Sequence, residues 1–468
     1  MRVQTFTLII ATLVLASCAP APPPAAQLPA AEPTSVQQPA TAQPAAEPTN
    51  TQQPAAAQPA ADLSGEITAM SWNVSPENDK VLQDQVAAFE QSHPGTKISL
   101  TLLPYDQYNQ KLALLFSSGT PPDSFAMPAD IMRYVQEGHV LPLDEYMNAD
   151  PVLSDKAQSR TEANDLVRLD GEHVYVAQYG PLCSEQLYFN KDLFDKAGLS
   201  YPDENWTWDD FLAAAQKLTV RDGDETTQWG VDLGYMGGWD GGWQSLMWSR
   251  GGTLADTNFN PTELNLNSPE AIDAFQWLQD LVYKYEVAPP PAVAKSLQQA
   301  GGPFLSGRVG MVVDGCWMLS AYKGGNFELG MTLIPKGPAG RVGPIWYAMT
   351  FVIAKASKNP ELAWEWSRWL AVDEKANELQ ASTGQSCGAP IVRKYDEMYS
   401  AAWKDVPGGE ACVKSLDNTK FGQIYAANWQ EIWDTIIAPE WDKLMNGTQS
   451  AEEFTAAISE KVNQKLQE

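Results

Sequence analysis

The sequence predicts an α/β protein, and three observations support that class. Residues 66–72 and 97–103 read as strands, and the second of these runs alternates apolar and polar residues. Between them lies a helical pattern that has Pro76 at its first position, where the missing backbone N–H does no harm. From residue 66 onward strand and helix patterns alternate steadily, which indicates a mostly parallel sheet covered by helices.

The same alternation continues along the chain. A strand is predicted from Pro122 and another over residues 186–190. Helix starts are predicted where a short polar side chain precedes an apolar periodic run, at Asp130, Thr207, Ser268, Asn359 and Ser450. Ser450 is followed three residues later by Glu453, the pattern of a capping box, so the last helix is expected to run almost to Glu468.

One strand in the second half of the chain ends in residues that suit a binding site. Val309–Val313 is a short apolar run typical of a buried strand, and Asp314-Gly315 after it is a turn signal. Trp317 follows at once. Because ligands of α/β proteins gather outside the carboxyl ends of strands, Asp314 and Trp317 are candidate ligand contacts. The alternative is a buried turn with a core tryptophan.

Composition limits the function classes. The chain has 468 residues, of which 44% are hydrophobic, so it can build the cores of two or three domains. Its 58 acidic and 31 basic residues give a net charge of −27. This charge argues against nucleic acid and anionic membrane surfaces as partners, since both need clustered lysine and arginine.

The N-terminus predicts export and a lipid anchor. Arg2 precedes a short apolar segment, residues 6–15, which fits a signal peptide rather than a membrane span. The following Leu-Ala-Ser-Cys resembles the bacterial lipobox, in which cleavage after residue 17 leaves Cys18 as the lipidated N-terminus. The alternative is an ordinary signal peptide with a chance cysteine.

A disordered tether is predicted from residue 18 to residue 63. Residues 30–44 (AAEPTSVQQPATAQP) recur almost unchanged as residues 45–59 (AAEPTNTQQPAAAQP). This Pro/Ala/Gln-rich sequence has almost no large apolar side chains, so it cannot form a core. We interpret the repeat as a linker and not as a solenoid.

Enzyme and metal motifs are scarce, whereas tryptophan is abundant. The chain has three histidines, none at metal-ligand spacing, and no nucleotide-binding motif or nucleophile elbow, so no metal or other cofactor is expected. Among its 17 tryptophans, Trp239 and Trp243 lie in a Gly-rich segment and are four residues apart, which would put them on one helix face. Flat aromatic rings beside carboxylates suit sugars. The alternative is that both belong to the core, as predicted for Trp364, Trp366 and Trp369.

From about residue 66 the chain resembles a known family. The matching stretches run in the family's order: ITAMSWN, AFEQSHPGTKISL, GTPPDSFAMPAD, LYFNKDLFDKAGLSYPDENWTWDDF, GRVGMVVDGCWM and IPKGPAGRVGPIWYAMTFVIAKASKNPELAWEW. They are similar to the extracytoplasmic solute-binding proteins of ABC importers, in the sugar-binding group related to maltose-binding protein. The resemblance implies the two-lobed type II fold of periplasmic binding proteins, with a hinge and a ligand cleft between the lobes. We expect one lobe from residues 64–180 and 332–386 and the other from residues 181–331 and 387–468.

The resemblance also implies a function and a binding site. It implies a lipid-anchored, monomeric protein outside the cytoplasm that captures a sugar or oligosaccharide and delivers it to the permease subunits of an ABC transporter. The implied ligand-binding residues are Trp72, Asn73, Asp130, Trp239, Asp240, Trp243, Asp314, Trp317, Trp346 and Tyr347. Trp346 and Tyr347 fall where the family more often has glycine. The alternatives are a protein that binds a cation such as a polyamine through Asp130, Asp240 and Asp314, and a surface-anchored glycosidase.

The remaining cysteines are expected to form two disulfides outside the cytoplasm. They are Cys183, Cys316, Cys387 and Cys412, which allow three connectivities. The pair Cys387–Cys412 is closest in sequence, but Cys183 and Cys387 both fall near expected lobe crossings and form a rival pair. Peptide mapping without reduction distinguishes these pairings, and free thiols at all four positions would contradict both.

Overall fold

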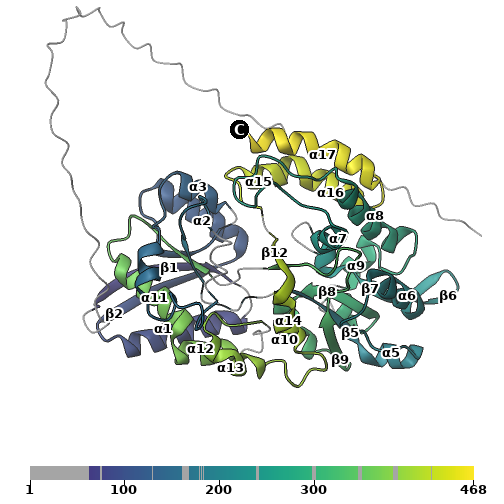
Figure 1. Cartoon of the computed structure of the whole chain (residues 1–468), viewed down its shortest axis with the longest axis horizontal. Coiled ribbons are helices and arrows are strands. Elements are labelled where there is room, and N and C mark those ends of the chain that lie inside the picture. The colour runs from purple at the N-terminus through teal and green to yellow at the C-terminus, as the bar shows by residue number, and fades with distance from the viewer. Residues whose placement is uncertain are drawn as a thin grey trace, which may run out of the picture. The chain divides into compact units, whose positions relative to one another are not determined.

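The structure is a computed structural model that describes residues 63–468 apart from 74–75, 129, 161–167, 179, 181, 183, 239–241, 298–301, 346–349, 383–387 and 423. The predicted signal peptide, Cys18 and the tether up to residue 62 lie outside the described residues. The described residues are organised around two five-stranded sheets, each with its own helices (Figure 1). We call these two assemblies the first and second lobes.

The sheet of the first lobe has the strand order β2-β1-β3-β11-β4. Its strands are β1 (Gly65–Trp72), β2 (Thr96–Leu103), β3 (Ser124–Ala126), β4 (Val176–Gln178) and β11 (Thr350–Ile353). β1 runs parallel to β2 and β3, whereas β11 runs antiparallel to both of its neighbours. β2, β1, β3 and β4 therefore share one direction and β11 is reversed, so the prediction of a mostly parallel sheet holds for this lobe except at β11.

Helices cover the sheet of the first lobe and supply its core. They are α1 (Pro76–Ser92), α2 (Tyr105–Ser117), α3 (Ile131–Gln136), α4 (Asp144–Ala149), α11 (Pro360–Val372), α12 (Glu374–Ala381) and α13 (Asp396–Ser400). The apolar face of α1 places Phe89 against the rings of Trp366 and Trp369 on α11. Trp364, Trp366 and Trp369 are all buried, which confirms that they belong to the core.

The sheet of the second lobe has the strand order β6-β7-β8-β5-β9. Its strands are β5 (Glu185–Asn190), β6 (Val220–Asp222), β7 (Glu225–Asp232), β8 (Val309–Gly315) and β9 (Leu329–Leu333). β8 is parallel to β7 and antiparallel to β5. Side chains of β8 alternate between two cores: Met311 and Val313 pack on one face, and Val312 packs on the other. Burial of both faces explains the uninterrupted apolar run in the sequence.

The helices of the second lobe come from the middle and the end of the chain. They are α5 (Lys191–Ala197), α6 (Trp208–Leu218), α7 (Trp243–Ser249), α8 (Pro269–Tyr283), α9 (Pro291–Leu297), α10 (Leu319–Lys323), α14 (Ala411–Lys414), α15 (Trp429–Ile432), α16 (Ala438–Met445) and α17 (Ala451–Leu466). The capping box predicted at Ser450 is formed, Thr207 at the predicted start of α6 forms a second one, and Ser268 caps α8 through its side chain. In contrast, Asp130 precedes α3 without a side-chain capping bond.

A two-stranded sheet pairs β10 (Gly343–Ile345) with β12 (Thr419–Phe421) and ties together segments that precede and follow the first-lobe residues 350–400. Tyr395 donates a hydrogen bond to the carbonyl of Val372 at 2.7 Å and packs with Tyr399 and Val392. These contacts place residues 391–399 on the first lobe. We propose that the last crossing lies after Ser400, further along the chain than the predicted boundary at residue 387.

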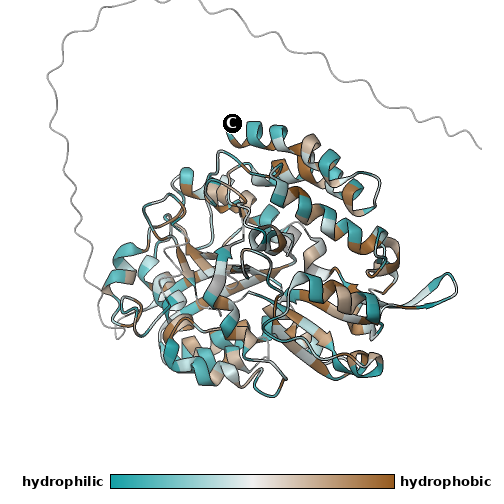
Figure 2. Cartoon of the chain, turned by 45° about the vertical axis from the view of Figure 1, so that its right-hand side comes forward, coloured by the Kyte–Doolittle hydropathy of each residue, from teal (hydrophilic) through white to brown (hydrophobic). Residues whose placement is uncertain are grey.

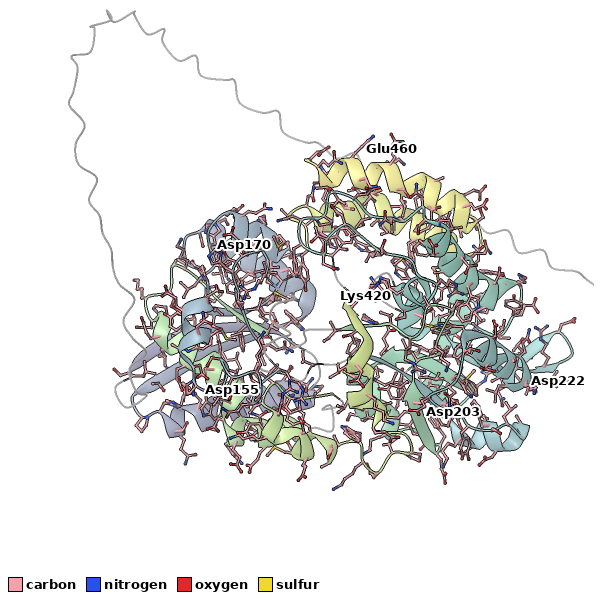
Figure 3. The ribbon with its side chains drawn as sticks, viewed as in Figure 1. Asp155, Asp170, Asp203, Asp222, Lys420 and Glu460 are labelled. Atoms are coloured by element: carbon pink, nitrogen blue, oxygen red, sulfur yellow. The ribbon has the colours of Figure 1, made fainter. Side chains whose placement is uncertain are left out.

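Apolar and charged side chains are segregated in the expected way. The hydrophobic colouring gathers on the strands and on the inward sides of the helices (Figure 2). Asp203, Asp222 and Glu460, which Figure 3 labels, are exposed acids, so part of the acidic excess is solvated. Within the part of the chain that the structure describes, no helix combines the length and apolar character needed to cross a membrane.

Candidate functional site

The predicted site residues divide into those that the structure describes and those that it does not. Trp239, Asp240, Trp346 and Tyr347 lie outside the described residues. Trp72, Asn73 and Asp130 belong to the first lobe, and Trp243, Asp314 and Trp317 belong to the second lobe.

In the first lobe, Trp72 and Asn73 stand at the carboxyl end of β1. Trp72 is half-buried, and its ring packs in a T-shaped arrangement with that of Tyr108 at a centroid distance of 5.3 Å. Tyr108 in turn donates a hydrogen bond to the carbonyl of Ala126. Asn73 is exposed, and its Nδ2 donates to Oδ2 of Asp79 at 2.6 Å. The two residues therefore present an aromatic ring and an amide at one strand end.

Asp130 is held by an arginine of α3, the short helix that follows it. Nη2 of Arg133 lies 2.6 Å from Oδ2 of Asp130, and Nε lies 3.1 Å from the same oxygen. Nη2 also donates to the hydroxyl of Tyr134 at 3.0 Å. The carboxylate therefore orients Arg133 instead of capping α3, and the pair offers both a donor and an acceptor.

In the second lobe, β8 continues through Asp314 and Gly315 instead of turning at them as predicted, since both residues pair with β5. The carboxyl group of Asp314 is buried. Its Oδ1 accepts from the backbone N–H of Gly315 at 2.7 Å, and its Oδ2 accepts from the hydroxyl of Tyr322 at 2.7 Å. Asp314 therefore holds the end of the strand in place.

Trp317 lies one residue beyond Cys316, in a short 3-10 turn (Cys316–Met318). It is half-buried and packs against the core on one face of the second sheet. Its indole covers Gly315 so closely that a Cβ on Gly315 would come within 2.2 Å of the ring. Only glycine leaves room for this arrangement. An indole held over a strand end with part of its surface exposed can stack on a ligand ring.

Trp243 is a core residue. It is fully buried at the start of α7, and its ring centroid is 4.6 Å from that of Phe275. A ring with no exposed surface cannot stack on a ligand in this conformation, so we leave Trp243 out of the proposed site. Spacing alone could not separate the two roles, because a core face and a ligand face of a helix share the same period.

Residues 73–377 match the family described as bacterial extracellular solute-binding protein. The chain belongs to this family. Curated relatives include an arabinooligosaccharide-binding protein from Halalkalibacterium halodurans, which is 24% identical over 68% of this chain and 70% of the relative. A galactooligosaccharide-binding protein from Bacillus subtilis is 26% identical over 73% of this chain and 72% of the relative.

Solved structures show the same fold. An ABC substrate-binding protein from Listeria monocytogenes in complex with cycloalternan has a TM-score of 0.73 and 24% identity, and the match covers 86% of this chain and 99% of that chain. The maltose/maltodextrin-binding domain from Bdellovibrio bacteriovorus, bound to maltotriose, has a TM-score of 0.67 and 16% identity, with 86% and 100% covered. The two-lobed type II fold implied by the sequence is confirmed.

The second lobe of this solute-binding protein contains a buried acid that sequence reasoning missed. Glu185, the first residue of β5, is fully buried. Its Oε2 accepts from the hydroxyl of Ser245 on α7 at 2.8 Å. Within the described part of the chain, its Oε1 has no hydrogen-bond partner. The available signal was a single acid at the start of an apolar strand.

Three acids of the second lobe have pKa values that are raised above the ordinary value. Burial raises the pKa of Glu185 to about 8, partly opposed by the Ser245 hydrogen bond. Burial also raises the pKa of Asp314 to about 6, opposed by Tyr322 and the N–H of Gly315. For Asp232, burial raises the pKa against the hydrogen bonds from the N–H groups of Gly234 and Phe304. The second lobe of the binding protein thus contains three buried carboxyl groups whose pKa values are raised by burial.

The two cysteines that the structure describes take part in disulfide bonding. Cys316 and Cys412 are both disulfide-bonded, and both are buried in the core that Trp317 borders. Cys183 and Cys387 lie outside the described residues, so the predicted pairings stay predictions. A bond at Cys316 anchors the turn that carries Trp317.

Proposed function

We propose that this protein is the solute-binding component of an ABC importer and that it captures a sugar or oligosaccharide in the cleft between its lobes. Family membership supplies the solute-binding role. The observation that carries the carbohydrate assignment is the half-buried indole of Trp317, which covers Gly315 at the end of β8. Relatives named for arabino- and galactooligosaccharides support the same class of ligand. The partner that receives the sugar would be the permease of the transporter.

The alternative of a polyamine-binding protein is weakened, because two of the carboxylates that it requires are already engaged within the protein. A polyamine needs carboxylates that are free to face it. Asp130 is paired with Arg133, and Asp314 is buried with hydrogen bonds to Tyr322 and Gly315. Both groups are therefore engaged within the protein, whereas aromatic rings remain at the strand ends. This arrangement favours a neutral ligand.

Calorimetry on the exported protein tests the proposal. The panel is an arabinooligosaccharide, a galactooligosaccharide and maltotriose, with spermidine as the cationic comparison. Binding of at least one carbohydrate, recovered unchanged by chromatography, would support a binding protein that does not act as an enzyme. Binding of spermidine alone, with an affinity that falls steeply as salt rises, would overturn the carbohydrate assignment.

We expect Trp317→Ala to weaken carbohydrate affinity about thirtyfold, because truncating a stacking tryptophan at a binding hot spot removes about 2 kcal/mol. Titration calorimetry and the melting temperature are measured together. Trp277→Ala is the matched control, since Trp277 is another half-buried tryptophan that packs on Trp208 and Phe211 in the helical layer. This control should lower the melting temperature and leave affinity unchanged. The same behaviour from Trp317→Ala would make Trp317 a core residue.

We also propose that Cys18 carries a lipid that anchors the protein outside the cytoplasm as a monomer. The basis is the Leu-Ala-Ser-Cys sequence followed by a tether with almost no large apolar residues. Cys18→Ser is expected to move the protein from the membrane fraction to the soluble exported fraction without lowering its melting temperature. The sedimentation coefficient of the released protein tests whether it is a monomer. A Cys18→Ser protein that stays with the membrane would contradict the anchor.

A further inference from the structure

Glu185 occupies a position that links two parts of the second lobe. In the sheet it pairs with Gly315 of β8, the glycine that Trp317 covers. On the helical side it accepts the hydrogen bond from Ser245 in the first turn of α7. Glu185 therefore pairs through its backbone with the strand end that precedes Trp317, and its buried side chain contacts α7.

The first turn of α7 is fitted closely around this carboxyl group. A Cβ on Gly242, the residue before α7, would lie 3.2 and 3.3 Å from the two carboxyl oxygens and 2.8 Å from Cγ of Met236. The first backbone bond of α7, from the N–H of Leu246 to the carbonyl of Gly242, measures 3.2 Å. A change in the charge or solvation of Glu185 would therefore disturb the packing of the first turn of α7.

We propose that Glu185 is a positioning residue for ligand binding: its buried carboxyl group holds the first turn of α7 against the end of β8 and so keeps Trp317 in place. The link between Trp317 and ligand binding rests on the proposed function. The attachment of α7 to β5 and β8 does not, because it can be measured in the protein without ligand.

The carboxyl group does this as a neutral acid. Burial raises its pKa to about 8, and the negative charge of Asp314 acts in the same direction. Among the described residues, the titratable groups that face it are Asp314 from β8 and, beyond Asp314, Asp232 from β7; α7 contributes the neutral Ser245. If α7 opens and Glu185 becomes solvated, the side chain returns to its ordinary pKa of 4.5 and loses its proton. Opening is therefore coupled to proton release.

This coupling predicts the pH dependence of hydrogen exchange in α7. Amide protection over residues 242–249, corrected for intrinsic exchange, should fall about tenfold for each pH unit between 6.5 and 8 and then level off. The lower limit lies above the pKa of Asp314, which is raised only to about 6, so most of the Asp314 titration falls below this window. Glu185→Gln should abolish this fall, because the amide is neutral at every pH. Exposed Glu452→Gln is the matched control and should retain the wild-type slope.

Affinity supplies the second readout. Ser245→Ala and Glu185→Ala should each weaken binding about tenfold for the carbohydrate of the three-member panel that wild type binds most tightly, since each removes the hydrogen bond between β5 and α7. Glu185→Gln should restore most of that loss. A wild-type exchange profile without slope, the same slope in Glu185→Gln, or full affinity in folded Ser245→Ala would overturn the inference. If no panel member binds, the proposed function fails, and the exchange profile still decides whether Glu185 holds α7.

Discussion

Arg368→Met is expected to lower the free energy of unfolding of the first lobe by about 3 kcal/mol, because it breaks a buried ion pair and leaves its partners without a cation. Arg368 on α11 contacts Oδ2 of Asp150, and its Nη1 lies 3.2 Å from Oε1 of Glu365. The side chain of Asp150 is 3% exposed and that of Glu365 is 13% exposed. Neither carboxylate can recover the lost interaction from water.

The acids around Arg368 have few other sources of compensation. Asp150 keeps two hydrogen bonds, from the N–H groups of Val152 and Leu153 at 2.8 and 2.7 Å. Glu365 keeps only a 3.6 Å contact to Nε2 of His93 within the described network. Burial already raises the pKa of Glu365, with Arg368 opposing that shift. The variant should therefore raise this pKa further and favour the protonated acid.

Urea unfolding followed by circular dichroism measures the effect. Lys80→Met is the matched control, since Lys80 and Asp84 form an exposed pair with side chains 70% and 43% exposed. Such a surface pair contributes about 0.5 kcal/mol or less. If Arg368→Met changed stability as little as this control does, the ion pair would be solvated in solution and its buried geometry would be wrong.

Local signals explain why several elements of the fold could be predicted from the sequence. The capping boxes at Thr207 and Ser450 depend on residues three positions apart, so each can be recognised without knowledge of the rest of the chain. The order of the strands depends on pairings between distant segments, such as β3 with β11, and no local pattern encodes them. The antiparallel direction of β11 could therefore not be predicted, although its sequence is apolar.

The candidate site was harder to predict because the same residue types serve as ligand contacts and as structure. Trp243 and Trp317 both follow glycine-containing segments, yet the first is enclosed by Phe275 and its neighbours and the second keeps an exposed part. The sequence predicted a free carboxylate for Asp314 at a strand end, but the hydroxyl of Tyr322, eight residues further on, donates a hydrogen bond to it. Glu185 was overlooked because a single acid at the start of an apolar strand is usually expected at an exposed edge.

Glu185→Gln is expected to make the protein more stable than wild type at pH 8, by on the order of 4 kcal/mol, and almost no more stable at pH 4.5. The pKa of Glu185 is raised from 4.5 to about 8 in the folded protein. Below pH 4.5 the acid is protonated in both the folded and unfolded states, so its stabilising contribution is fully present. Between pH 4.5 and 8 the unfolded chain releases the proton while the folded protein retains it. The contribution of Glu185 to stability therefore falls as pH rises through this window, and glutamine removes that loss.

Unfolding free energies of wild type, Glu185→Gln and Asp314→Asn, measured in urea from pH 4.5 to pH 8.5, isolate this contribution. The net charge of −27 acts on all three proteins and largely cancels in the differences. Because the pKa of Asp314 is raised only to about 6, Asp314→Asn should change the slope only below that pH. Glu185→Gln should instead diverge progressively from wild type up to pH 8 and then run parallel to it. A constant difference at every pH would mean that Glu185 is ionised in the folded protein, and its role as a neutral acid in the second lobe would have to be abandoned.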